Sequence, residues 1–142
     1  AAGSLGWGFP ASLGAKAANP DSPVFCFTGD GGFWYHLSEI ETAVRWNLNS
    51  ITIVNNNSSL NQEIGVNEKA YGGKLSHNHG DLWKFKETNF KNVAESLGAK
   101  GIRVENPKEI SSAIEEAVDS NQPCVIDVVT DIYAFPPKPW LG

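Results

Sequence analysis

Four short, mainly apolar runs divide the chain and constrain its fold more than any other feature of the sequence. They are found at residues 24–27, 51–54, 102–104 and 124–129. The first is continuously apolar, which is typical of a strand that is buried on both faces of a parallel sheet. The segments between the runs carry apolar residues at helical spacing. Strands that alternate with helices predict an α/β fold, with a doubly wound, mainly parallel sheet and helices on both faces.

The helices between these strands are predicted from apolar spacing and from residues that start or stop a helix. We expect helices at residues 10–18, 33–44, 90–97 and 110–118. Pro10 suits a first helical position, and Pro20 ends the helix before it. Gly98 closes the third helix, and the Asn-Pro-Lys-Glu segment at 106–109 resembles a capping box for the last one.

The segment from 62 to 88 lacks such a pattern and is predicted to be a long loop. A loop of this length inside a compact domain is usually functional or mobile. His77 and His79 form a His-x-His motif there, which could bind a metal, but no third ligand is evident nearby. We therefore interpret both histidines as residues of a solvated loop.

The composition excludes several classes of function. The net charge is −5 and no Lys/Arg cluster stands out, which argues against nucleic-acid binding. No apolar run is long enough to span a bilayer, so no membrane partner is expected. Cys26 and Cys124 each lie in an apolar run and are expected to be small buried hydrophobes. Two thiols without a signal peptide favour a reducing compartment, and we expect a cytoplasmic protein.

The domain organisation is expected to be simple. A chain of 142 residues normally forms one domain. We assign residues 1–130 to that domain and residues 131–142, which are rich in proline, to a C-terminal tail. The chain opens Ala-Ala-Gly and holds no Met, so we expect it to be a piece of a longer protein whose domain is truncated at its N-terminus.

Polar motifs follow the first two predicted strands. They are Thr-Gly-Asp-Gly-Gly at 28–32 and Asn-Asn-Asn-Ser-Ser at 55–59. Ligands of open α/β sheets bind beyond the carboxyl ends of the strands. Glycines followed by a helix start favour a phosphate group, but Asp30 is itself an anion and would need a bridging cation. Mg²⁺ suits this role, and Asn57 offers an amide oxygen as a second ligand. Each motif alone is most often a turn or a solvated loop, so the prediction depends on their pairing.

This pairing resembles the signature of thiamine-diphosphate-dependent enzymes. The spacing between Asp30 and Asn57 matches that family, and the intervening segment 38–45 is similar to the family's helix. The segment 3–10, Gly-Ser-Leu-Gly-Trp-Gly-Phe-Pro, is similar to a stretch of the acetolactate synthases. The resemblance runs from residue 3 to about residue 129 and implies the thiamine diphosphate-binding fold, in its C-terminal, diphosphate-binding (PP) domain.

The resemblance implies a role for each matching residue. Asp30 and Asn57 would be the side-chain ligands of Mg²⁺, and Ser59 would add its backbone oxygen. The turn Gly29, Gly31 and Gly32 would hold the diphosphate, with N–H groups donated by the last two.

The upstream segment would hold the rings of the cofactor. The carbonyl of Gly3 and the amide of Leu5 would bind the pyrimidine edge, and the Leu5 side chain would be an apolar wedge that bends the cofactor. Residues 34–36 depart from the residues usual in acetolactate synthases, so the substrate is open. His36 is predicted either to contact substrate or to pack against its neighbours, with packing or support of the site favoured.

The implied activity belongs to a longer protein. The resemblance implies thiamine diphosphate and Mg²⁺ as cofactors, and a 2-oxo acid substrate that is decarboxylated and joined to a second carbonyl compound. The family's glutamate lies on a separate pyrimidine domain of a neighbouring subunit. We therefore expect a homodimer or homotetramer of the parent chain, and no catalysis by this chain alone.

Alternative functions stay open at the level of sequence. The parent could be another thiamine-diphosphate decarboxylase, oxidase or lyase, or a non-catalytic cofactor-binding paralogue. A dinucleotide-binding domain is disfavoured, because no Gly-x-Gly-x-x-Gly follows the first strand and Asp30 would repel a pyrophosphate that has no cation.

Overall fold

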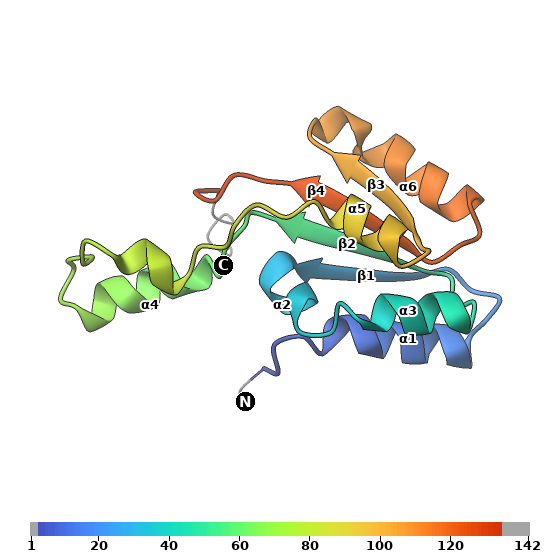
Figure 1. Cartoon of the computed structure of the whole chain (residues 1–142), viewed down its shortest axis with the longest axis horizontal. Coiled ribbons are helices and arrows are strands. Elements are labelled where there is room, and N and C mark those ends of the chain that lie inside the picture. Colours follow the sequence, from blue (N-terminus) through green and yellow to red (C-terminus); the bar gives the residue numbers. More distant parts are fainter. Residues whose placement is uncertain (1–2, 135–142) are drawn as a thin grey trace, which may run out of the picture.

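The computed structural model describes residues 3–134, which form one layered α/β unit (Figure 1). The strands are β1 (Val24–Gly29), β2 (Ser50–Asn56), β3 (Lys100–Val104) and β4 (Cys124–Val129). The α-helices are α1 (Gly8–Ala18), α2 (Asp30–Trp34), α3 (Glu39–Arg45), α4 (Gln62–Ala70), α5 (Phe90–Ser96) and α6 (Ile110–Asp119). Two short 3₁₀ helices are η1 (His79–Leu82) and η2 (Pro107–Glu109). The proline-rich end of the predicted tail, residues 135–142, lies outside the described residues.

The four strands form one parallel sheet in the order β1-β2-β4-β3. All four arrows in Figure 1 point to the same edge, where α2 lies and from which the α4 segment extends. In the register of β1 and β2, Gly29 pairs with Asn55. The residues that follow these two strands are therefore placed side by side at the carboxyl edge of the sheet.

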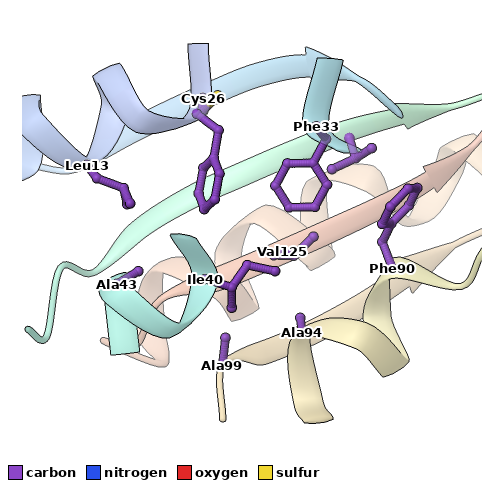
Figure 2. Packing of buried hydrophobic residues seen from close by; sticks show 11 residues of the cluster. Leu13, Cys26, Phe33, Ile40, Ala43, Phe90, Ala94, Ala99 and Val125 are labelled. Carbon is purple, nitrogen blue, oxygen red and sulfur yellow. The ribbon is translucent and has the colours of Figure 1, made fainter. Parts of the chain in front are cut away.

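Two hydrophobic clusters, one on each face of the sheet, hold the layers together. On one face, α1, α2, α3 and α5 pack their buried side chains against Cys26, Val54 and Val125. Phe33 and Phe90 meet edge to face, with ring centroids 5.4 Å apart (Figure 2). On the other face, α6 packs against Ile51 and Ile126. The predicted α/β fold with helices on both faces is confirmed.

The strand β1 is less buried than its sequence predicts. Phe25 is 47% exposed and Phe27 is 76% exposed, although both lie in a continuous apolar run. The strand is at the edge of the sheet, and α1 covers the face on which Cys26 points inward. On the opposite face α6 packs on β3 and β4, so within residues 3–134 no helix packs behind β1.

The predicted second helix is divided in the structure. Instead of starting near Phe33 and continuing, α2 begins at Asp30 and α3 begins at Glu39. The turn between them is tightened by bonds from the His36 N–H to the Phe33 carbonyl and from the Glu39 N–H to the His36 carbonyl. Such three-residue steps keep the apolar side chains on the core side, so the sequence pattern does not reveal the break.

The segment 62–88 is also more ordered than predicted, because it contains α4 and η1. Neither element buries a residue. A helix without a buried face needs no apolar residues at helical spacing, so its sequence shows no helical periodicity. For this reason the sequence pattern predicted a loop here.

The two cysteines are buried and free, as expected of small hydrophobes. Burial raises the pKa of the Cys124 thiol to about 12 and also raises that of Cys26, against a smaller opposing effect of Ser12. Both residues are therefore protonated thiols near neutral pH. None of the helices in residues 3–134 combines the length and the apolar character needed to cross a membrane.

Thr52 is a site where a substitution should stabilise the fold. Its side chain is 1% exposed, and its hydroxyl has no hydrogen-bond partner among the described residues. Thr52→Val removes the unsatisfied hydroxyl at nearly constant volume and should stabilise β2 by about 1 kcal/mol. Hydrogen exchange of the β2 amides in the full-length protein measures this gain, and slower exchange is expected. Faster exchange would show that the hydroxyl has a partner.

Candidate functional site

The candidate site lies where β1 and β2 end side by side. Asp30 follows β1 directly and is the first residue of α2, and Asn57 follows β2 directly. The backbone of α2 leaves its first N–H groups without partners inside the helix, because an α-helix bonds each N–H to a carbonyl four residues earlier. The site therefore combines a carboxylate, an amide oxygen and backbone N–H groups that have no partner inside the helix.

Asp30 is a buried carboxylate. It is 2% exposed, and its Oδ1 accepts a hydrogen bond from the Gly31 N–H at 2.8 Å. Its Oδ2 accepts from the Ser59 N–H at 3.1 Å. Burial raises the pKa of the Asp30 carboxyl, and these backbone hydrogen bonds oppose that rise. No Lys, Arg or His of the described residues forms an ion pair with it, so no side chain of residues 3–134 balances its charge when it is ionised.

Asn57 and Ser59 contact each other beside Asp30. Asn57 Oδ1 accepts from the Ser59 N–H at 3.1 Å and from the Ser59 hydroxyl at 2.9 Å. The Ser59 N–H is thus shared between Asp30 and Asn57, which places the two side-chain oxygens next to each other. No donor among the described residues binds the Ser59 carbonyl. Two of the three oxygens predicted to hold Mg²⁺, those of Asp30 and Asn57, are therefore neighbours, and all three are of the hard donor type that this ion prefers.

The two glycines after Asp30 are needed for close packing in the turn. A methyl group placed on Gly31 would lie 2.5 Å from Leu60 Cδ2, and one placed on Gly32 would lie 3.1 Å from Thr28 Oγ1. Gly29 differs, since a methyl group there would meet no atom within 4 Å. Packing therefore requires glycine at position 31 and favours it at position 32, whereas no neighbour excludes a side chain at position 29.

The loop before α1 lies against this turn. A methyl group on Gly32 would lie 3.6 Å from Leu5 Cδ1, and Leu5 is 50% exposed. Gly6 has a φ of +90°, and a methyl group on it would lie 2.6 Å from Tyr35 Cβ and 3.0 Å from His36 Cδ2. His36 is exposed and packs on Gly6. Gly3 is exposed, with no atom within 4 Å of a methyl group placed there. The structure thus brings Leu5 to the glycine turn, and it leaves Gly3 and His36 exposed.

A buried polar network behind the site was not predicted from the sequence. Asn56 is 3% exposed, and its Nδ2 donates to Asp127 Oδ1 at 2.8 Å. Asp127 is fully buried and forms an ion pair with Arg103 Nη1 at 2.7 Å. The sequence held one signal of this network, because Asp127 is the only charged residue in the apolar run 124–129.

The His-x-His motif has a packing role in part. The His79 ring stacks on Trp83, with ring centroids 5.6 Å apart, and its Nδ1 accepts from the Trp83 indole N–H at 3.2 Å. Because Trp83 is 2% exposed, His79 is more than a solvated loop residue. His77 is exposed, as predicted for a solvated loop.

Comparisons with known proteins bear on this arrangement. Residues 1–128 match the family described as "Thiamine pyrophosphate enzyme, C-terminal TPP binding domain". The probable acetolactate synthase large subunit of Methanococcus aeolicus is 36% identical over 130 residues, which are 91% of this chain and 21% of that protein. The acetolactate synthase isozyme 3 large subunit of Escherichia coli (strain K12) is 31% identical over 132 residues, which are 91% of this chain and 22% of that protein.

A solved structure is similar as well. The thiamine diphosphate-dependent 4-hydroxybenzoylformate decarboxylase of Rhodococcus jostii RHA1 matches with a TM-score of 0.78 and 26% identity. The match covers 89% of this chain and 23% of that chain. The chain thus spans about a fifth of the length of the relatives it matches. The family predicted from the paired motifs is confirmed, and this chain belongs to the thiamine pyrophosphate enzymes as a C-terminal TPP-binding domain.

Proposed function

We propose that this chain binds the diphosphate of thiamine diphosphate through Mg²⁺, with ligands from Asp30, Asn57 and the Ser59 carbonyl. The observation that carries the proposal is the shared Ser59 N–H, which lies 3.1 Å from an oxygen of Asp30 and 3.1 Å from an oxygen of Asn57. A cation would balance the charge of this buried carboxylate, which lies beside the amide oxygen of Asn57. Mg²⁺ takes few protein oxygens and completes its shell with phosphate oxygens and water.

The chain's own groups would orient the cofactor. The Gly32 N–H lies in the first turn of α2 and is proposed to donate to a phosphate oxygen. The Gly31 N–H, proposed for the same role, donates to Asp30 Oδ1 at 2.8 Å and would have to exchange that acceptor for a phosphate oxygen. Leu5 borders this turn and would support the rings, with Gly3 at the pyrimidine edge. When bound, thiamine diphosphate supplies a carbon that adds to the carbonyl of a 2-oxo acid and accepts the electron pair left when CO₂ departs. The contribution of this chain is positioning.

The parent protein is proposed to decarboxylate a 2-oxo acid and to join the product to a second carbonyl compound. The support is that several curated relatives are named as acetolactate synthases. Because the chain spans about a fifth of those proteins, the pyrimidine domain, its glutamate and the assembly as a cytoplasmic homodimer or homotetramer are parts of the same proposal. So is the division into a domain at 1–130 and a tail at 131–142.

Decarboxylation without carbon–carbon bond formation is the second candidate. A hollow beside the glycine turn has aromatic walls from Trp34, Tyr35 and Phe85, with Lys84 and Lys86 at its border. Aromatic walls and ammonium groups suit an aromatic 2-oxo acid, and the structurally similar protein is named as a decarboxylase of such a compound. This observation favours an aromatic substrate over pyruvate.

Product analysis separates the two candidates. The full-length protein would be incubated with thiamine diphosphate and Mg²⁺, and either pyruvate or 4-hydroxybenzoylformate. Acetolactate and CO₂ from pyruvate would support carboligation, whereas 4-hydroxybenzaldehyde and CO₂ would support the decarboxylase. If neither substrate releases CO₂ while the cofactor binds, both assignments are wrong and the non-catalytic alternative gains support.

Leu5→Ala should lower turnover more than cofactor affinity. The side chain borders the glycine turn at Gly32 and is proposed to support the rings rather than the diphosphate. Removing it would leave the Mg²⁺ ligands in place and loosen the reactive geometry, which we expect to lower kcat by at least about tenfold. Steady-state kinetics together with calorimetric cofactor binding measure both quantities, and an unchanged kcat would refute the wedge role.

A further inference from the structure

Ser58 has a backbone conformation that serine rarely adopts. Its φ is +55°, in the left-handed region, and it lies between the two proposed ligand residues Asn57 and Ser59. For a residue with a Cβ this region costs about 1–2 kcal/mol. Such a conformation persists only where neighbouring groups hold it in place.

Two hydrogen bonds fix the backbone of Ser58, one at its N–H and one at its carbonyl. Its N–H donates to Asn56 Oδ1 at 3.3 Å. Its carbonyl accepts from the Phe85 N–H at 2.7 Å. Asn56 is therefore the side chain that binds the N–H of the strained residue, one position before the first proposed ligand.

Asn56 is itself fixed by buried partners. Its Nδ2 donates to Asp127 Oδ1 at 2.8 Å and to the Thr88 carbonyl at 2.9 Å. The other oxygen of Asp127 accepts from Arg103 Nη1 at 2.7 Å and from the Phe90 N–H at 3.0 Å. These bonds leave the Asn56 amide one orientation, with its oxygen toward Ser58.

We propose that Asn56, fixed by Asp127, is a positioning residue that holds Ser58 in the left-handed conformation and thereby sets the geometry of the Mg²⁺ ligands. The inference rests on the proposed Mg²⁺ site. With Ser58 in this conformation, the Ser59 N–H meets Asn57 Oδ1 and Asp30 Oδ2 together. If Ser58 relaxed to a negative φ, the chain direction after Asn57 would change and this convergence would be lost.

The test measures the Mg²⁺ dependence of thiamine diphosphate binding by calorimetry on the full-length protein. Asn56→Ala should raise the Mg²⁺ concentration for half-saturation by about tenfold or more, the usual effect of removing a group that orients a ligand. Asn49→Ala is the matched control. Asn49 Nδ2 also donates to an asparagine oxygen, Asn121 Oδ1, at 3.1 Å, but at the opposite end of β2. Cofactor binding to the Asn49→Ala variant should therefore depend on Mg²⁺ as it does in the wild type.

Rescue separates positioning from a general loss of stability. Glycine adopts a positive φ at little cost, so Ser58→Gly added to Asn56→Ala should restore much of the Mg²⁺ affinity. The proposal is overturned if folded Asn56→Ala keeps the wild-type Mg²⁺ dependence, or if Ser58→Gly restores nothing. Should Asn56→Ala fail to fold, Ser58→Val replaces it. A β-branched residue resists this φ, so an unchanged Mg²⁺ dependence in that variant would also overturn the proposal.

The wild type shows whether the proposed function or this inference has failed. If the wild-type protein binds thiamine diphosphate without needing Mg²⁺, or does not bind it, the proposed site is wrong. If binding needs Mg²⁺ and the Asn56 and Ser58 variants behave as wild type, only the positioning role is wrong.

Discussion

Asp30→Asn is expected to abolish Mg²⁺-dependent binding of thiamine diphosphate to the full-length protein. Asp30 is the only charged side chain among the three proposed ligands, and an amide has no net charge to balance the cation. The substitution keeps the size of the side chain but replaces one acceptor oxygen with an NH₂ group, so loss of binding would reflect the loss of the carboxylate rather than of side-chain volume. Calorimetric titration of the cofactor in the presence of Mg²⁺ measures it, and binding at wild-type affinity would contradict the assignment.

The same variant should be more stable than the wild type when no metal is present. Burial raises the pKa of Asp30 above its ordinary value of 3.8. The stability that the protonated carboxyl contributes is present below pH 3.8 and is lost as pH rises through the folded-state pKa. Because asparagine does not titrate, its advantage in thermal midpoint should grow with pH across that window. A wild-type protein that is the more stable of the two at neutral pH without metal would show that the backbone hydrogen bonds to the carboxylate outweigh the cost of burying its charge.

Arg103→Met is expected to destabilise β3 and β4 by about 3–5 kcal/mol, the usual cost of leaving a buried charge without its partner. The guanidinium bonds Asp127 at 2.7 Å, and the Asp127 side chain is 0% exposed. Arg103 also forms ion pairs with Glu87 at 2.8 Å and Glu105 at 2.9 Å. Both of these carboxylates are largely exposed, so the loss of these two pairs should cost little stability. Hydrogen exchange of the β4 amides in the full-length protein measures the free energy of opening.

A matched arginine supplies the control. Arg45 bonds Glu41 at 2.9 Å, but both side chains are more than half exposed, so Arg45→Met should cost no more than about 0.5 kcal/mol. Adding Asp127→Asn to Arg103→Met should recover part of the loss, because the unpaired charge is then removed. Equal exchange rates in the Arg103 and Arg45 variants would show that the buried ion pair contributes no more to stability than the exposed one.

Local patterns in the sequence predicted most of the fold. The apolar runs that became β2 and β4 are buried on both faces, and the stripe of α6 covers one of those faces. The edge position of β1 could not be predicted, because a sequence does not show which strand lacks a neighbouring helix. The helix α4 was missed for a related reason, since it buries no residue.

The residues of the candidate site that directly follow a strand could be predicted from the sequence. Asp30 and Asn57 were found because parallel strands bring their carboxyl ends together. The buried network beside Asn57 was not predicted. In the sequence Asn56 is one more residue of a polar run, whereas in the structure its side chain donates to Asp127 on β4. The left-handed Ser58 was also hidden, because serine gives no local signal of a positive φ.

The central claim is that Mg²⁺ joins Asp30, Asn57 and Ser59 to the diphosphate of thiamine diphosphate. The most direct measurement is a calorimetric titration of thiamine diphosphate into the full-length protein, first with Mg²⁺ and then with EDTA. Saturable binding that requires Mg²⁺ and disappears with EDTA is the predicted result. Binding of equal affinity in both conditions, or no binding in either, would contradict the claim.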